Sequence, residues 1–128
     1  MPLAHAVAQD LLERYGRAWE AFDGEAWADL FTDHVESHEE PFHPPMVGRN
    51  AVRIYLLEAS RRQEQVEFTV ERHWVVESTV LAAWHASYVA RDTKQRVRLS
   101  GFMVLELDGD GRISRLREWW HRRPARTA

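Results

Sequence analysis

The sequence predicts a single α+β domain, residues 1–128, in which three N-terminal helices pack on an antiparallel β-sheet. Two observations lead to this prediction. Apolar residues recur at steps of three and four along the first part of the chain, and after Arg62 the pattern changes to alternation. Because the helices come first and the strands last, an α+β arrangement is favoured over an alternating parallel sheet. A chain of 128 residues is also of ordinary size for one domain.

The first predicted helix runs from Leu3 to Phe22 and is amphipathic. The pair Asp23-Gly24 ends it, and the Asp23 carboxylate can cap a second helix that carries Trp27 on its buried face. The apolar residues that recur at steps of three and four are Val7, Leu11, Tyr15, Ala18 and Phe22.

A short strand is predicted over 33–39, before a stiff loop whose prolines exclude a helix. A third helix follows Gly48, with an inward face made of Val52, Tyr55, Leu56 and Ala59.

The rest of the chain is predicted to form long strands. Alternation begins at Val66 and continues to Glu77, and the segments 81–91 and 95–107 form a hairpin. The turn Asp108-Gly109-Asp110-Gly111 then introduces a last strand, 112–121.

Two residues of the hairpin turn set its predicted register. If Asp92 pairs with Gln95, then Trp84 lies opposite Met103, and the adjacent pairs are Ala86 with Gly101 and Tyr88 with Leu99. Trp84, Ala86 and Tyr88 then face the helices, whereas His85 and Ser87 point away; a slip of one residue would reverse these faces.

Composition excludes several classes of function. The net charge of −3 argues against nucleic acid as the main partner, and the basic stretch 122–126 is interpreted as a solvated chain end. Without cysteine the chain has no disulfide, thiolate metal site or cysteine nucleophile. No apolar run approaches the roughly 20 residues that span a bilayer, and no signal pattern opens the chain. A cytoplasmic protein without a membrane partner is therefore expected.

One face of the predicted sheet is covered by the helices, but the opposite face also carries apolar residues. Phe102, Val104 and Val89 are too apolar for open water. We expect a second copy of the chain to cover this outer face, giving a homodimer.

Several motifs carry a resemblance to a known family. Four segments resemble, in order and spacing, those of SnoaL-like domains of the nuclear transport factor 2-like superfamily. They are residues 27–42, the opening of the third helix at 48–52, the turn 105–113 and the end of the last strand at 117–121. This resemblance implies a cone-shaped barrel in which a curved antiparallel sheet wraps three helices around a cavity. It does not choose a function, because the family includes ketosteroid isomerases, polyketide cyclases, limonene-epoxide hydrolases, dehydratases and non-catalytic binding modules.

Two residues are candidate catalytic groups. Glu118 matches a final-strand position that is acidic in several family members, and alternation with Leu116 and Trp120 directs it inward. A carboxyl among aromatic rings has a raised pKa and can act as a general acid or base. His38, in the first strand, corresponds to a position that often borders the family's cavity, and it could shuttle a proton. Both also have a purely structural interpretation, as a carboxylate paired with an arginine and as a hydrogen-bonded wall histidine.

The six tryptophans favour either an aromatic core or an aromatic-lined cavity. No metal site and no cofactor are expected, since the cluster of His38, Glu39, Glu40 and His43 has no metal-ligand spacing. The predicted ligand-binding residues are Tyr15, Trp19, Trp27, Trp84, Tyr88, Met103 and Trp120.

Two specific branches of the family match poorly. The isomerase branch needs a general-base carboxylate on the strand after the second helix, where Glu36 or Glu40 could stand. The epoxide-hydrolase branch needs an Asp-Arg-Asp trio that neither face of strand 81–91 supplies. We therefore expect a pocket protein for a small, largely apolar molecule, either a cofactor-independent isomerase, cyclase or dehydratase or a non-catalytic binding or dimerisation module.

Overall fold

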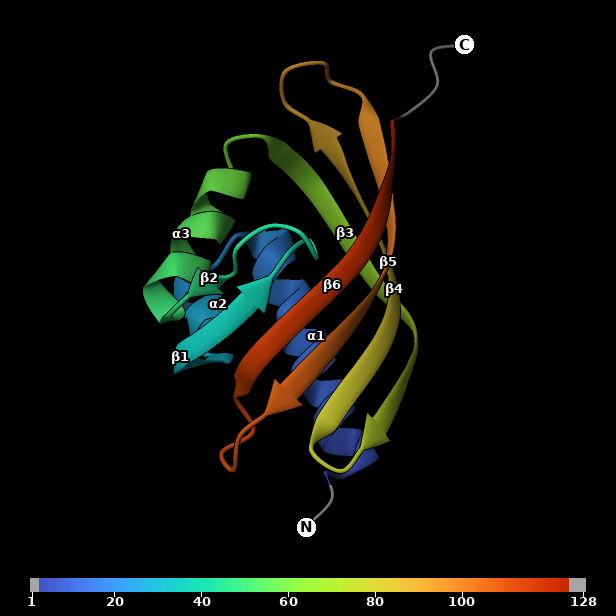
Figure 1. Cartoon of the computed structure of the whole chain (residues 1–128). Helices are drawn as coiled ribbons and strands as arrows, with labels where there is room; N and C mark the ends of the chain where they lie inside the picture. Colours follow the sequence, from blue (N-terminus) through green and yellow to red (C-terminus); the bar gives the residue numbers. More distant parts are fainter. Residues whose placement is uncertain (1–2, 125–128) are drawn as a thin grey trace.

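The computed structural model describes residues 3–124 (Figure 1). Three helices lie against one face of a curved sheet, which confirms the predicted α+β fold. Residues 125–128 lie outside the described residues, so the predicted solvated end is seen only at Arg122 and Arg123, both exposed. The elements are α1 (His5–Ala21), α2 (Gly24–Ala28), β1 (Phe31–His38), β2 (Met46–Val47), α3 (Arg49–Ala59), β3 (Gln63–Val76), β4 (Thr79–Ala90), β5 (Arg96–Leu107) and β6 (Ile113–Pro124).

The sheet is mixed rather than wholly antiparallel, which corrects one detail of the prediction. The strand order is β2-β1-β6-β5-β4-β3, and β1 pairs with β6 in parallel while the other neighbours are antiparallel. Three hairpin connections bring β6 back beside β1, where it runs in the same direction. Since β2 and β3 remain as edges, the sheet is curved but not closed into a barrel (Figure 1).

The long hairpin has the predicted faces but a different register. Trp84 pairs with Gly101 and Tyr88 with Val97, two residues away from the expected partners. The reason is a longer loop: Ala90, not Asp92, pairs with Gln95, and Lys94 takes a left-handed conformation (φ 59°). A shift of two residues preserves the side-chain alternation, so Trp84 and Tyr88 still face inward.

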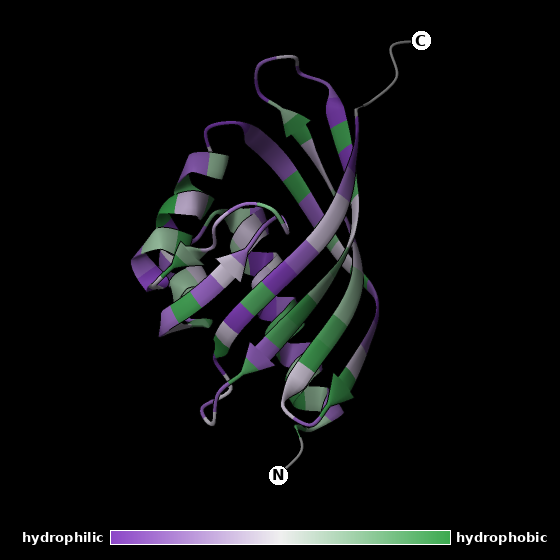
Figure 2. Ribbon diagram, in the orientation of Figure 1, coloured by the Kyte–Doolittle hydropathy of each residue, from purple (hydrophilic) through white to green (hydrophobic). Residues whose placement is uncertain are grey.

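The core lies between the helices and the inner face of the sheet. Hydrophobic and hydrophilic residues alternate along the strands, as Figure 2 shows. The predicted cap of α2 is confirmed, because the Asp23 carboxylate accepts a hydrogen bond of 3.1 Å from the Ala26 amide. Fully buried core side chains include Leu11, Leu30, Phe31, Val35, Val52, Val80, Met103, Leu105, Ile113 and Leu116.

Candidate functional site

An interior cavity of about 190 Å³ lies between the three helices and the inner face of the sheet. Helices supply one wall and the strands β4, β5 and β6 supply the other, so the site depends on the whole fold. Its lining is aromatic with a few polar groups, the usual character of a small-molecule site. The lining residues are Tyr15, Trp19, Trp27, Glu39, Tyr55, Leu56, Ala59, Arg62, Gln63, Trp84, Tyr88, Leu99, Glu118, Trp120 and Arg122.

Alternation along β6 determines which of its side chains face the cavity. Leu116 is packed in the core, and Glu118, Trp120 and Arg122 follow on the same face, each two residues further toward the open end. The strand therefore runs from apolar core, past an acid and an indole, to a cation. The exposed fraction of Glu118 is only 6%, while Arg122 is exposed.

An acid cluster lies at the inner end of this row. The Tyr15 hydroxyl donates to Oε1 of Glu118 over 3.2 Å. The Glu39 carboxyl lies near Glu118, and the Tyr55 hydroxyl lies near Glu39, so that each group shifts the pKa of its neighbour. Two carboxyls and two phenols from α1, α3, β6 and the segment after β1 thus form one cluster in the cavity wall.

The surroundings of Glu118 favour its neutral form. Burial, and then the charge of Glu39, raise the pKa of Glu118 well above its usual value. Burial also raises the pKa of Glu39, although the neighbouring Glu118 and Tyr55 side chains favour its carboxylate form. We infer that one proton is shared between the two carboxyls and lies mainly on Glu118. The pKa of Tyr15 is raised well above its usual value by burial and by Glu118, so the phenol remains a donor.

This arrangement predicts that ionisation of Glu118 opposes folding. Its raised pKa stabilises the fold below the ordinary value of 4.5, and that stabilisation is lost as the pH rises from there through the folded-state pKa. Glu118→Gln keeps a neutral donor and acceptor at all pH values. We expect the melting temperature of the variant, relative to that of the wild type, to rise by a few degrees as the pH increases from 5 to 8.

The measurement is thermal denaturation followed by circular dichroism across that pH range. Glu67→Gln, on the exposed surface of β3, is the matched control and should show no such trend. A pH-independent difference between Glu118→Gln and the wild type would mean that the carboxyl ionises in the fold without cost.

The indole groups of the cavity differ in their partners. Trp19 Nε1 donates to the Gln63 side chain over 2.9 Å, and Trp120 Nε1 donates to the Glu39 carbonyl over 3.2 Å. The buried Nε1 atoms of Trp27 and Trp84 have no hydrogen-bond partner among the described residues. An unpaired buried N–H is costly, so these two donors are exceptions to the usual pairing of buried polar groups.

The structure brings most of the predicted site residues together. Glu118 and the aromatic residues predicted on α1, α2, β4 and β6 line the cavity. Met103 does not, because it is fully buried beneath the wall. The residues of the prediction that line the cavity are Tyr15, Trp19, Trp27, Trp84, Tyr88, Glu118 and Trp120.

The position of His38 corrects the prediction that it borders the cavity beside Glu118. On β1, Val35 and Ser37 are buried inward, so alternation turns His38 to the other side, where its Nε2 lies 3.5 Å from Glu36. It is absent from the cavity lining. Glu39, one residue further, occupies the place next to Glu118.

Sequence reasoning did not assign Glu39, Tyr55, Gln63, Arg62 or Arg122 to the site. The sequence places Glu39 only in a metal-like cluster and Tyr55 only on the inward face of the third predicted helix. The signal available for Tyr55 was its inward position on the third predicted helix. Arg62 and Arg122 are 60 residues apart in the chain and meet only through the fold.

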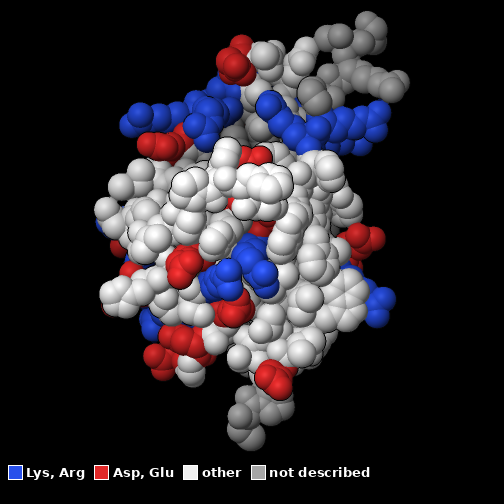
Figure 3. Space-filling view, viewed as in Figure 1, with Lys and Arg blue, Asp and Glu red and all other residues white. Residues whose placement is uncertain are grey.

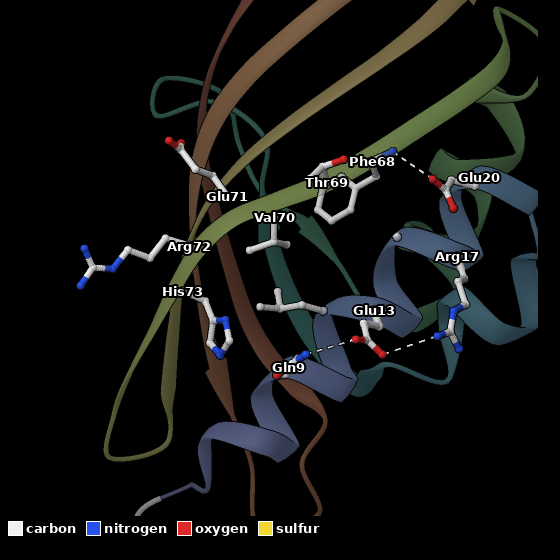
Figure 4. Close-up of a pocket in the computed structure, with 12 residues that line it drawn as sticks. Gln9, Glu13, Arg17, Glu20, Phe68, Thr69, Val70, Glu71, Arg72 and His73 are labelled. Carbon is white, nitrogen blue, oxygen red and sulfur yellow. Dashed lines mark hydrogen bonds and ion pairs between the residues drawn. The ribbon is translucent and has the colours of Figure 1, made fainter.

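A larger depression of about 510 Å³ lies outside the cone between α1 and β3 (Figure 4). Gly16 leaves room there for the Phe68 ring, since a Cβ atom at residue 16 would lie 2.7 Å from Cδ1 of Phe68. Its polar side chains are bonded locally: Glu13 accepts from Arg17, and Glu20 accepts from the Phe68 amide (Figure 4). It is an open, solvated groove without the buried acids of the interior cavity, so the cavity remains the candidate site.

Two further searches bear on the class of site. Residues 3–124 contain no group of three or more histidine, aspartate or glutamate side chains placed to hold a metal ion. Among the same residues, no helix has both the length and the apolar character needed to cross a membrane. His43, part of the metal-like cluster in the sequence, instead lies 2.8 Å from Glu40.

The model of the SnoaL-like domain family matches residues 12–116. No curated protein matches the sequence. The fold is similar to that of the epoxide hydrolase/cyclase-like enzyme SalBIII, with a role in pyran ring formation in the polyether salinomycin (TM-score 0.78, 19% identity, 89% of this chain and 90% of that one). It is also similar to an epoxide hydrolase from Mycobacterium tuberculosis described as LEH-like (TM-score 0.76, 20% identity, 91% and 84%). A third similar structure is a putative SnoaL-like polyketide cyclase from Shewanella denitrificans (TM-score 0.78, 11% identity, 90% and 90%). At these identities the likeness concerns the fold.

Proposed function

Since this chain belongs to the SnoaL-like domain family, we propose that it is a cofactor-independent acid–base enzyme that moves protons on a small, largely apolar substrate. The reaction class is isomerisation, cyclisation or dehydration of a molecule that carries a carbonyl, ether or hydroxyl oxygen. The observation that carries this proposal is the pair of neighbouring carboxyls, Glu39 and Glu118, in an aromatic cavity.

The two carboxyls have opposite roles. Glu118, which holds the shared proton, donates it to the substrate oxygen, and the Glu39 carboxylate accepts a proton from a substrate carbon or hydroxyl. In an isomerisation one proton is added at oxygen and one is removed from carbon, which gives an enol. The return steps, a proton to a different carbon and a proton from oxygen, restore both carboxyls without an oxidant, reductant or metal.

The phenols support these roles. Tyr15 donates to Glu118 over 3.2 Å and holds the inner carboxyl in place. When Glu118 has given up its proton, the same hydroxyl stabilises the new carboxylate. Tyr55 does the same for Glu39. The tryptophan rings keep water out and strengthen these electrostatic interactions.

Proton transfer at carbon can be tested without knowledge of the natural substrate. Small cyclic ketones and enones are incubated with the protein in deuterium oxide, and deuterium incorporation at carbon is followed by NMR. We expect exchange above the buffer rate for ligands that quench the tryptophan fluorescence saturably. Saturable binding without exchange or turnover across ketones, epoxides and hydroxy ketones would instead favour a non-catalytic binding module.

The outer face of the sheet supports a second proposal, that two copies associate there. The Trp74 and Phe102 rings pack at a tilt of 44° with their centroids 6.2 Å apart. Trp119 is 43% exposed, and the Arg117 guanidinium lies 5.7 Å from its ring. A two-fold interface joins the same surface patch of both copies, so an aromatic sheet face can be buried against its own copy. This is the surface on which the sequence predicts a homodimer.

Light scattering at micromolar concentration measures this directly. We expect a mass twice the 15.0 kDa of one chain, and a monomer for Phe102→Glu. Phe42→Glu is the matched control, because Phe42 is 97% exposed and lies in the loop before β2. A monomeric wild type would overturn the proposal.

A further inference from the structure

The volume of the cavity limits the size of what it can hold. An apolar cavity of about 150 Å³ holds a benzene molecule, and this one measures about 190 Å³. Drug-sized ligands need roughly 300 Å³ or more. The walls give little extra room, because Trp27 and Trp84 are almost fully buried and packed against other rings. The space therefore fits one ring with a short substituent, and not a fused four-ring skeleton.

The open end of the cavity is basic although the chain as a whole is acidic. Arg62 and Arg122 line the cavity and are exposed, so they mark its mouth. Figure 3 shows Lys and Arg side chains gathered at this end of the molecule, on both sides. A mouth lined by one sign of charge concentrates ligands of the opposite sign.

Some basic side chains at this end have a fixed ion-pair partner, whereas these two arginines have none among the described residues. Arg91 and Lys94, at the same end, are paired with Glu64 at 3.0 Å and 3.2 Å. Neither Arg62 nor Arg122 has an ion-pair partner among the described residues. Gln63 adds an amide donor beside them, because its oxygen already accepts from Trp19.

The acid cluster and the basic mouth are separated by a distance that a small ligand can bridge. Arg122 follows Glu118 by four positions on β6, which corresponds to roughly 13 Å along the strand. The arginine side chain reaches back over part of this length. A ring of six carbons with a carboxylate on a short chain spans the remainder.

We propose, building on the proposed function, that the substrate is a single-ring carboxylic acid. Its apolar ring fills the aromatic cavity with the reacting oxygen toward Glu118, and its carboxylate lies between Arg62 and Arg122. The arginines then select the ligand by charge and fix its orientation, while the acid cluster performs the chemistry.

The probe is 3-cyclohexylpropanoate, and its comparison is 3-cyclohexylpropanamide, which has nearly the same shape without the charge. Binding is measured by isothermal titration calorimetry at low and high salt. We expect the acid to bind about tenfold more tightly than the amide, the usual gain from a hydrogen bond to a charged group. High salt should reduce that preference.

Paired variants separate the mouth from general surface charge. In Arg62→Gln/Arg122→Gln the preference for the acid should disappear, with the affinity for the amide unchanged. The control, Arg61→Gln/Arg123→Gln, changes the neighbouring exposed arginines, which do not line the cavity, and should retain the preference.

Three outcomes would overturn the inference. One is equal binding of acid and amide, a second is a preference that survives loss of Arg62 and Arg122, and a third is that neither probe binds. None of these results removes the proposed acid–base function, which is judged separately by deuterium exchange with neutral ketones and the Glu118 variant. Conversely, selective acid binding without any exchange would leave the anion site in place and refute the chemistry.

Discussion

Glu118→Gln is expected to reduce proton-transfer turnover by about 10²–10⁴-fold, the usual contribution of a general acid or base, while the protein folds as well as the wild type. The amide has the shape of the neutral carboxyl. Its oxygen can accept the Tyr15 hydroxyl bond, now 3.2 Å, and its NH₂ can donate to Glu39. What it cannot do is release a proton. The loss is therefore chemical rather than structural.

The comparison with Glu39→Gln tests the division of roles. This variant removes the base, so its turnover should fall by a similar factor of about 10²–10⁴. Ligand affinity, measured by tryptophan fluorescence, should change little in either variant, so the loss lies in kcat. The pH profile of the wild type should be bell-shaped, since the pair must hold a single proton.

Glu36→Gln is the matched control, because Glu36 lies on β1 near Glu39 but is exposed and outside the cavity. Its turnover should equal that of the wild type. If Glu118→Gln keeps full turnover of a substrate that the protein converts, Glu118 is not the acid, and the pair of carboxyls serves only the fold.

Much of this site could be predicted from alternation alone. The prediction of which β4 side chains face inward needs only the period of two. It remains correct despite the error in hairpin register, because a shift of two residues leaves Trp84 and Tyr88 on the same face. Glu118 was placed inward by the same rule, between Leu116 and Trp120. Tyr15 follows from the stripe of the first helix.

The partner of Glu118 could not be predicted in this way. Local sequence does not reveal that β1 runs parallel to β6, nor that their pairing shifts between Phe31 and Glu36. That pairing sets Ser37 beside Leu116 and so brings Glu39 close to Glu118, with His38 turned outward. Whether His38 or Glu39 faces Glu118 depends on the register between β1 and β6, and this register is set by tertiary packing.

Gly101→Ala is expected to destabilise the protein by about 2 kcal/mol, the usual cost of overpacking a core, and to abolish ligand binding. A Cβ atom at residue 101 would lie 2.6 Å from Cζ2 and 2.7 Å from Cε2 of Trp84. On its other side the Trp119 carbonyl oxygen, at 2.9 Å, belongs to the backbone of a paired strand and cannot yield. The indole must therefore move away from β5.

The direction of that movement connects stability with function. Trp84 is 3% exposed and lines the cavity, with Phe68 and Trp19 packed against it at centroid distances of 5.8 Å and 6.3 Å. Since those rings block lateral escape, the displaced indole takes up cavity space. Guanidinium denaturation measures the free energy of unfolding, and fluorescence titration measures binding.

Gly109→Ala is the control, because a Cβ atom there would meet nothing within 4 Å. Trp84→Phe should rescue Gly101→Ala, since the smaller ring leaves room for the methyl group, and the two changes should be strongly non-additive. If Gly101→Ala proves as stable as the wild type and binds ligand normally, the indole does not rest on the glycine in solution. If rescue restores stability but not binding, then the Trp84 N–H, and not only the shape of the wall, takes part in holding the ligand.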